Sequence, residues 1–297
     1  MNDKGMLPPM QHGSVPGKHC LSAVLKKVLC HDYLQLTKRA GAFLEKDEIG
    51  CYDRLVNNQV LMVMTKRGLP KSVTSCIGDL RDNVVHVVKT IYGLSSASYG
   101  SMTDKPLYGP GQGSTCGPLF WLLCYWVIVT SLDPSITAGR FIYVCKDVIV
   151  ELTGVSFVDD SSLCVMTEYI ANPELIRLAS LGQYWERLLF STGGAIHFKK
   201  SHWYLMSWLW QAGIPRLATM RQSPASLSLS TGANILPDVV PRIEPTKDSA
   251  LWGCTLPLRV IMQNKLKSYE GMPSVDKYYL RAANTPLRIC CLLKLTR

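Results

Sequence analysis

The chain has 297 residues, of which 47% are hydrophobic and 18% charged, a globular balance that excludes a disordered or fibrous protein. Its formal net charge of +10 at pH 7 favours polyanionic partners, either nucleic acid or an anionic membrane surface. The longest apolar run, Leu119 to Val129, is much shorter than the roughly 20 residues that a bilayer-spanning helix needs. We therefore expect no membrane partner.

The cysteines indicate neither a zinc site nor a disulfide framework, because none of the 11 forms a Cys-x-x-Cys pair. Residues 1–19 lack the apolar run of a secretory leader, so we expect an intracellular, reducing compartment, with nucleus and cytoplasm equally compatible. Residues 242–297 carry 10 basic and 4 acidic side chains, net +6. This segment either contacts phosphates or forms a solvated basic surface.

Hydrophobic periodicity and turn residues predict a mixture of helices and strands without strict alternation, which indicates an α+β fold. Helices are expected at Cys20–Leu36, Asp53–Arg67, Ser72–Thr90, from about Ser114, and from Asn172 to Gly193. Short strands are expected on both sides of an acidic turn within Val155–Val165, and as a pair at Ala195–Lys199 and Trp203–Trp210.

Three short segments contain the residues most suited to chemistry. The first is Asp47–Asp53, the second is Gly111–Thr115, and the third is Ser156–Ser161. Taken singly each has a plain interpretation, since Asp-Asp suits a turn and Gly-Gln-Gly before Ser114 suits a helix entry. The second segment is not a nucleotide-binding P-loop, because no lysine follows its glycines.

Taken together and in this order, the segments resemble the palm motifs of reverse transcriptases, the RNA-directed DNA polymerases of retroelements. Asp47 begins a sequence of the form Asp-x-x-Gly-Cys-Tyr-Asp, and Phe157-Val158-Asp159-Asp160 is similar to the aromatic-x-Asp-Asp hairpin. Further matches are Gly111–Pro118 to the Gly-Gln-Gly loop, Gly193–Lys200 to the strand after the hairpin, Gln11–Lys18 to a segment of non-LTR and intron-type members, and Trp252-Gly253-Cys254 to the primer grip.

The resemblance implies nucleotidyl transfer with two Mg²⁺ ions, or Mn²⁺ in their place. Such ions take hard oxygen ligands and stabilise the attacking and leaving oxygens at the α-phosphate. The implied ligands are Asp47, Asp159 and Asp160. Lys200, or Lys199, is the implied general acid for the pyrophosphate, although two adjacent lysines also suit a solvated strand end.

The resemblance also assigns residues to the substrates, which are an RNA or DNA template, a primer strand and deoxynucleoside triphosphates. Tyr52 would lie under the incoming sugar and exclude a ribose 2′-hydroxyl, the plain alternative being a buried aromatic residue. Gln112 and Gly113 would lie against the incoming nucleotide and template, and Phe157 and Val158 near the primer end.

The expected architecture is a polymerase palm, a small antiparallel sheet backed by helices, with truncated fingers and a partial thumb. We expect a residual fingers and palm-entry segment at 1–40, the palm at 41–221, a loop or linker at 222–246 and a basic connection or partial thumb at 247–297. Such a chain suggests a truncated or degenerate retroelement copy, whose fingers, RNase H or endonuclease segments are lost or lie on another chain.

Two other functions stay open. The chain could be a non-catalytic nucleic-acid-binding remnant whose basic residues 242–297 contact phosphates. It could also be an RNA-directed RNA polymerase of the same architecture, although a bulky Tyr52 disfavours ribonucleotides.

Overall fold

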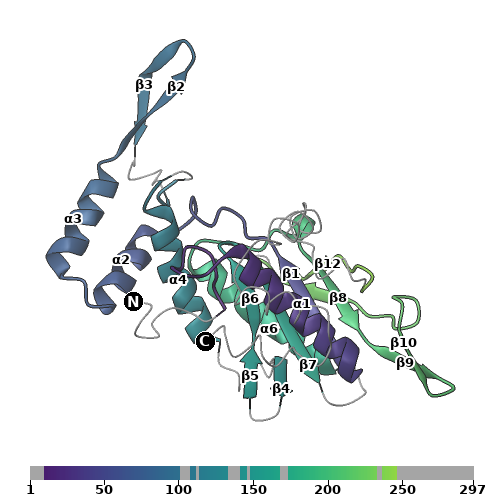
Figure 1. Cartoon of the computed structure of the whole chain (residues 1–297). Coiled ribbons are helices and arrows are strands. Elements are labelled where there is room, and N and C mark those ends of the chain that lie inside the picture. Colours follow the sequence, from purple (N-terminus) through teal and green to yellow (C-terminus); the bar gives the residue numbers. More distant parts are fainter. Residues whose placement is uncertain are drawn as a thin grey trace, which may run out of the picture.

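The computed structural model describes residues 10–100, 108–111, 114–132, 141–145, 148–167, 173–232 and 236–245. They form an α+β fold built on a four-stranded antiparallel sheet in the order β6-β7-β1-β8, which confirms the predicted fold class (Figure 1). The strands of this sheet are β1 (Ala40–Lys46), β6 (Gly154–Phe157), β7 (Asp160–Thr167) and β8 (His202–Met206).

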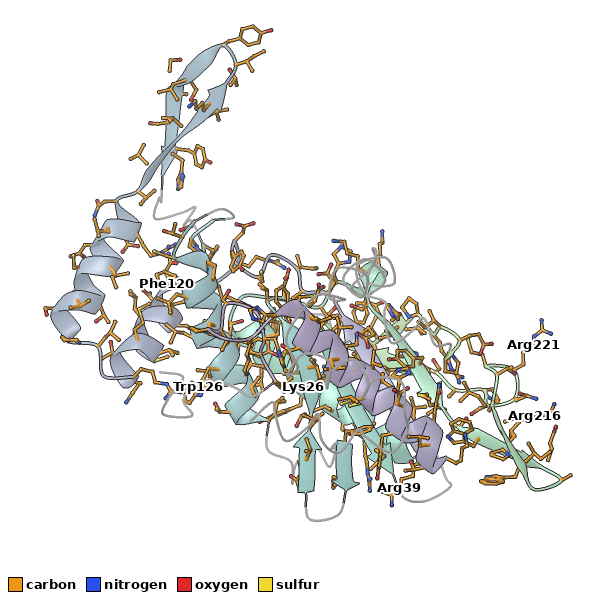
Figure 2. All side chains as sticks on the ribbon, in the orientation of Figure 1. Lys26, Arg39, Phe120, Trp126, Arg216 and Arg221 are labelled. Atoms are coloured by element: carbon orange, nitrogen blue, oxygen red, sulfur yellow. The ribbon has the colours of Figure 1, made fainter. Side chains whose placement is uncertain are left out.

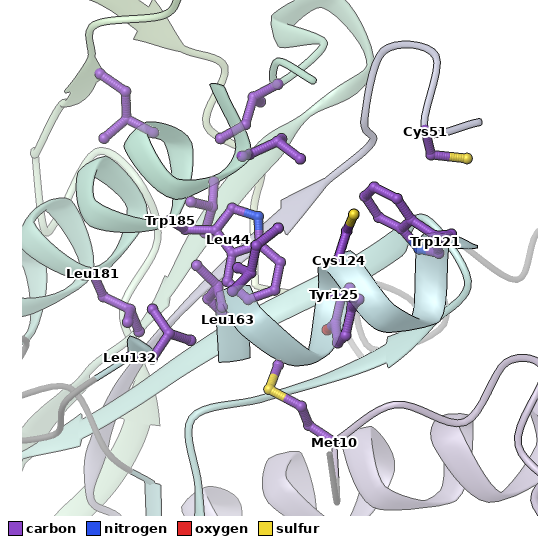
Figure 3. Packing of buried hydrophobic residues seen from close by; sticks show 14 of the residues in the cluster. Met10, Leu44, Cys51, Trp121, Cys124, Tyr125, Leu132, Leu163, Leu181 and Trp185 are labelled. Atoms are coloured by element: carbon purple, nitrogen blue, oxygen red, sulfur yellow. The ribbon is translucent and has the colours of Figure 1, made fainter. Parts of the chain in front are cut away.

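The central sheet is covered on both faces because its side chains alternate between two apolar clusters. On one face Leu44 and Leu163 pack with α4 (Gly117–Ser131) and α6 (Pro173–Ser191), as Figure 3 shows. On the other face Phe43 and Tyr204 pack with α1 (Cys20–Thr37). Both faces of β1 are therefore buried.

Helix α2 (Asn57–Lys66) packs on both α3 (Lys71–Asp82) and α4. The guanidinium of Arg67 lies 3.0 Å from the ring centre of Trp126, and that of Arg81 lies 5.4 Å from the ring centre of Phe120. Figure 2 labels both rings along α4. After α3 the chain forms a hairpin of β2 (Val85–Thr90) and β3 (Gly93–Gly100), which projects away from the central sheet in Figure 1.

The remaining described strands form three small antiparallel pairs, of which the first precedes β6 in sequence and the other two follow β8. These strands are β4 (Phe141–Cys145), β5 (Val148–Leu152), β9 (Trp208–Gln211), β10 (Ile214–Leu217), β11 (Leu227–Leu229) and β12 (Asp238–Val240). A single turn of 3-10 helix, Phe198–Lys200, precedes β8.

Several predicted elements are confirmed, including the first helix, the apolar helix after the glycine-rich turn, the hairpin around Asp159 and the helix that ends before Gly193. The helix expected at Ser72–Thr90 is wrong in its second half, because α3 stops at Asp82 and the β-branched residues that follow form β2. The expected pairing of Ala195–Lys199 with Trp203–Trp210 is also wrong. Ile196 forms a bridge with Glu48, and β8 pairs with β1.

Residues 222–246 are not an irregular loop throughout. Within them β11 pairs with β12, and the side chains of Leu227, Leu229 and Val240 are each 1% exposed within the main apolar cluster. The alternation of leucine and serine in β11 is a strand pattern that the surrounding prolines and serines obscured.

None of the helices in the described part of the chain combines the length and the apolar character that a bilayer-spanning helix needs.

Replacement of Leu229 by alanine should lower the free energy of unfolding by about 2–5 kcal/mol, because this buried side chain packs on α6 at Gly182. Urea denaturation followed by tryptophan fluorescence measures the change. The control is Val239→Ala on the paired strand, where a side chain 65% exposed should change stability by at most about 0.5 kcal/mol. Equally small losses from both variants would contradict the packing of this segment on the core.

Candidate functional site

The first and third motifs meet at one end of the central sheet. Asp47 directly follows β1, and Asp159 lies in the two-residue turn between β6 and β7. The register pairs Lys46 with Ser161. Because the two strands are antiparallel, Asp47, which follows Lys46, lies beside Asp160, which precedes Ser161. Residues 47 and 159, which are far apart in sequence, are therefore neighbours because antiparallel β1 and β7 share this end.

Asp47 is held by its backbone and has an accessible carboxylate. Its N–H donates to Ser201 Oγ at 3.3 Å, and its carbonyl oxygen accepts from the N–H of His197 at 2.9 Å. Its side chain is 22% exposed and forms an ion pair with Lys200, Oδ2 to Nζ 3.1 Å. The structure thus places the predicted Lys200 next to the first predicted metal ligand.

Asp47 and Asp159 lie close enough to Asp160 to affect its ionisation. Partial burial, together with the negative charges of Asp159 and Asp47, raises the pKa of Asp160 to about 6. Burial, together with the charge of Asp159 and a hydrogen bond to it, also raises the pKa of the Cys51 thiol. Concentrated negative charge at this end of the sheet attracts a cation.

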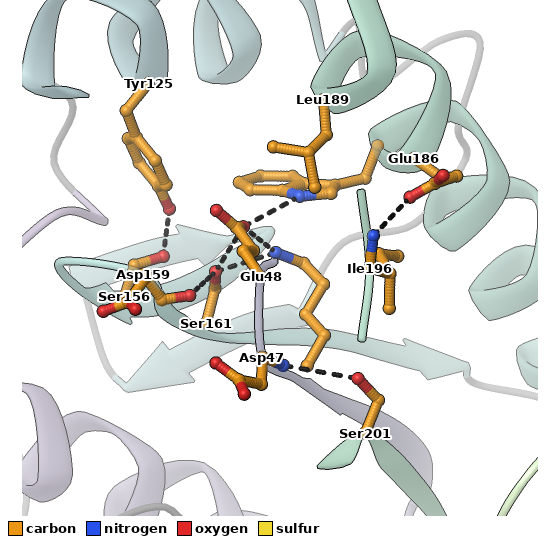
Figure 4. A network of polar contacts seen from close by, with 12 residues as sticks. Asp47, Glu48, Tyr125, Ser156, Asp159, Ser161, Glu186, Leu189, Ile196 and Ser201 are labelled. Carbon is orange, nitrogen blue, oxygen red and sulfur yellow. Dashed lines mark hydrogen bonds and ion pairs between the residues drawn. The ribbon is translucent and has the colours of Figure 1, made fainter. Parts of the chain in front are cut away.

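Next to Asp47 and Asp159 lies a buried polar network that sequence analysis did not predict (Figure 4). Lys46 Nζ donates to Glu48 Oε1 at 2.9 Å and to Ser161 Oγ at 2.7 Å, and it lies 3.5 Å from the ring centre of Trp185. The Trp185 indole N–H donates to the same Glu48 oxygen at 3.2 Å. The side chains of Lys46 and Glu48 are fully buried.

Burial governs the ionisation of this pair. It lowers the pKa of Lys46 to about 8 and raises that of Glu48, while their mutual attraction opposes both shifts. Ser161 Oγ also lies 3.3 Å from the carbonyl oxygen of Asp159, so the network reaches the turn that carries the second predicted ligand. The period-2 pattern of β1, which puts Lys46 on the face of Ala42 and Leu44, is the sequence signal that would have revealed this burial.

The second motif adjoins the first through Tyr52. A Cβ atom at Gly117, the first residue of α4, would lie 3.4 Å from Tyr52 Cδ1, so the half-buried tyrosine ring packs against this helix end. The N–H of Gly109 donates to the carbonyl of Leu55 at 2.8 Å, and a Cβ atom there would collide with the Tyr52 carbonyl. Gln112 and Gly113 lie outside the described residues.

The two hydrophobic residues of the third motif have different surroundings. Phe157 is partly exposed and pairs with Asp160 across the turn. Val158 packs its side chain on the main apolar cluster and on Gly13, and its carbonyl accepts from the Trp121 indole N–H at 2.8 Å. Both residues are partly exposed.

The carboxylates fit a divalent cation that is shared with a substrate. Among the described residues no three His, Cys, Asp or Glu side chains are grouped so that they could hold a metal ion by themselves. Mg²⁺ usually takes one or two carboxylates and completes its shell with water and substrate phosphates. Asp47 and Asp159, with Asp160 beside them, meet that smaller requirement.

No protein-family model matches the chain, and no curated protein matches it. Among solved structures the chain is similar to apo telomerase from Candida tropicalis truncated from its C-terminal domain, with 14% identity and a TM-score of 0.42 over 65% of this chain and 35% of that one. It is also similar to telomerase from Candida tropicalis in complex with a TWJ fragment of telomeric RNA, with 14% identity and a TM-score of 0.40 over 81% and 34% of the two chains. The chain therefore spans about a third of the length of these structures.

Replacement of Glu48 by alanine should lower the free energy of unfolding by about 3–5 kcal/mol, because Lys46 would keep a buried charge without its partner. Urea denaturation measures this loss. The double variant Lys46→Met, Glu48→Gln should cost clearly less, since its glutamine still accepts from Trp185 and no buried charge remains. A double variant that is less stable than Glu48→Ala would contradict this account of the network.

Replacement of Asp160 by asparagine should stabilise the protein in a pH-dependent way in metal-free buffer. The pKa of this carboxyl is about 6 in the folded chain against 3.8 for an unperturbed aspartate, so the unfolded chain loses the proton first and stability falls as pH rises through this window. The gain from Asp160→Asn should therefore grow between pH 4 and pH 7, as measured by urea denaturation at both pH values. Asp238→Asn, at an exposed site on β12, is the control, and a gain independent of pH would contradict the assignment.

Proposed function

We propose that this chain is the palm of a reverse transcriptase of a retroelement, which adds deoxynucleotides to a primer strand on an RNA or DNA template. The single observation that carries the proposal is the meeting of two motifs more than 100 residues apart. Asp47 at the end of β1 lies beside the turn that presents Asp159 and Asp160. Tyr52 and the start of α4 adjoin the same region, in keeping with the order of the motifs.

In the proposed reaction Asp47 and Asp159 hold the divalent cations, and Asp160 adds negative charge beside them. Bound Mg²⁺ or Mn²⁺ would stabilise the attacking 3′-oxygen and the leaving oxygen of an in-line displacement at the α-phosphate. The buried network of Lys46 and Glu48 keeps the ends of β1 and β7 in fixed register while these carboxylates are charged. Such fixed placement of ligands is what lets a site act without reorganising during the reaction.

Lys200 is the proposed proton donor to the leaving pyrophosphate. Its side chain is 66% exposed, and its ammonium lies 3.1 Å from Asp47 Oδ2. When Asp47 serves as a metal ligand, Lys200 would leave this ion pair and would be free to approach the phosphates. A lysine on an exposed side chain can make that movement at small energetic cost.

Tyr52 is the proposed selector for deoxynucleotides. Its ring is half-buried against Gly117, so its position is fixed by α4. A fixed ring beneath the sugar would exclude a ribose 2′-hydroxyl, whereas a mobile one would tolerate it. This feature favours a DNA polymerase over an RNA-directed RNA polymerase. The positive net charge of the chain favours nucleic-acid partners for either activity.

Primer extension tests the proposal. The purified chain, given poly(rA)/oligo(dT), dTTP and Mg²⁺ or Mn²⁺, should extend the primer, and Asp159→Asn should abolish extension because one of the two shared ligands is lost. Asp238→Asn, at an exposed position on β12, should extend like the parent.

The outcomes separate the three functions. Extension that survives Asp159→Asn would refute the assigned site, and equal use of rNTP and dNTP would indicate an RNA polymerase. Absence of extension by the parent, together with template binding that weakens steeply with salt and is insensitive to Asp159→Asn, would indicate a non-catalytic nucleic-acid-binding protein.

A further inference from the structure

The turn that carries Asp159 has an unfavourable backbone conformation. Val158, the first residue of the two-residue turn, has φ of 59°, a left-handed value that β-branched residues seldom adopt. Glycine is the usual residue at such a position of a tight hairpin. Interactions outside the turn must therefore hold it in place.

The side-chain amide of Gln11 supplies such interactions on both sides of Val158. Its Oε1 accepts from the N–H of Val158 at 3.0 Å, and its Nε2 donates to the carbonyl of Val158 at 3.0 Å. The same Oε1 accepts from the N–H of Gly13 at 2.8 Å, and Gln11 is 0% exposed. One buried side chain thus bonds both backbone groups of the residue directly before Asp159.

Gln11 is itself fixed by backbone pairing. The N–H of His12 donates to the carbonyl of Ser156, and the N–H of Ser156 donates to the carbonyl of Met10, both at 2.8 Å. Residues 10–12 therefore run parallel to β6 and form a single bridge with it, between Gln11 and Ser156. Gly13 completes the fit, because a Cβ atom there would collide with the backbone nitrogen and the side chain of Val158.

We propose that Gln11 is a positioning residue for the metal ligand Asp159, and that it acts by holding Val158 in the left-handed conformation. This inference rests on the proposed function for its choice of ligand, a divalent cation at Asp47 and Asp159. It assigns a role to residues 10–13, the segment before α1. The chemistry of the aspartates alone does not explain why this segment is needed.

Manganese affinity of the full chain, measured by the EPR signal of free Mn²⁺, tests the inference without requiring catalysis. Gln11→Ala should weaken Mn²⁺ binding about tenfold or more, the usual effect of removing a group that orients a metal ligand. The matched control is Gln183→Ala. Gln183 bonds both backbone groups of Ser230 in the same way: its Nε2 donates to the Ser230 carbonyl at 2.9 Å, and its Oε1 accepts from the Ser230 N–H at 2.8 Å. Ser230 follows β11 and is not part of the turn that carries the aspartates.

A conformational rescue distinguishes positioning from a general loss of structure. Val158→Gly removes the penalty for a positive φ, so Gln11→Ala in this background should weaken Mn²⁺ binding by no more than about twofold. If Gln11→Ala does not fold, Gln11→Glu provides the second variant. It keeps an acceptor for the N–H of Val158 and loses the donor to its carbonyl, which Trp121 still bonds. Gln11→Glu should then weaken binding by an intermediate factor.

Four outcomes would overturn the inference: no Mn²⁺ binding by the parent, unchanged affinity in Gln11→Ala, an equal loss in Gln183→Ala, or no rescue by Val158→Gly. Primer extension by the same variants separates this inference from the proposed function. Mn²⁺ binding that depends on Gln11 without any extension would retain the positioning role and refute the polymerase. Extension that is unaffected by Gln11→Ala would retain the polymerase and refute the positioning role.

Discussion

The end of β1 carries two opposite charges on opposite faces of a strand that is buried on both sides. Glu45 points to α1 and bonds Lys27 at 2.7 Å, while Lys46 points to α6 and bonds Glu48 at 2.9 Å. A buried charge is tolerated only where a partner is held beside it. Glu45 therefore fixes the position of α1 through Lys27, and Lys46 fixes that of β7 through Ser161. Asp47 follows directly, and its place is therefore determined from both faces of the sheet before any ligand binds.

This constraint explains why three carboxylates can be kept together. Burial and the negative charges of Asp159 and Asp47 raise the pKa of Asp160, and the repulsion between these charges favours separation of β1 from the hairpin. The Lys46 amine opposes that separation because it bonds Glu48 after β1 and Ser161 on β7 at once. A cation bound to the aspartates and the Lys46 amine would thus both oppose this separation. The cation would do so only when bound, whereas the amine does so always.

The sequence predicted the parts of the site that depend on local pattern and left out those that depend on contacts between distant segments. Periodicity located α1 and the hairpin around Asp159, and motif order indicated that Asp47 lies near it. Strand alternation predicts which face of β1 carries Lys46. Its burial could be predicted only by knowing that both faces of β1 are covered. The bond of Gln11 to Val158 joins residues 147 positions apart, and no local propensity encodes such a pairing.

Helix α4 links the two halves of the site. Its first residue, Gly117, packs against the Tyr52 ring, and one turn later Trp121 donates to the carbonyl of Val158. Tyr125, a further turn along, is hydrogen-bonded to Ser156 on β6. Because the side chains of Trp121 and Tyr125 are buried, α4 cannot shift at Tyr52 without moving the turn that presents the aspartates. Tyr52 and the turn that carries Asp159 are consequently held at a fixed spacing by one helix, which is what the proposed in-line transfer between a primer end and a triphosphate would require.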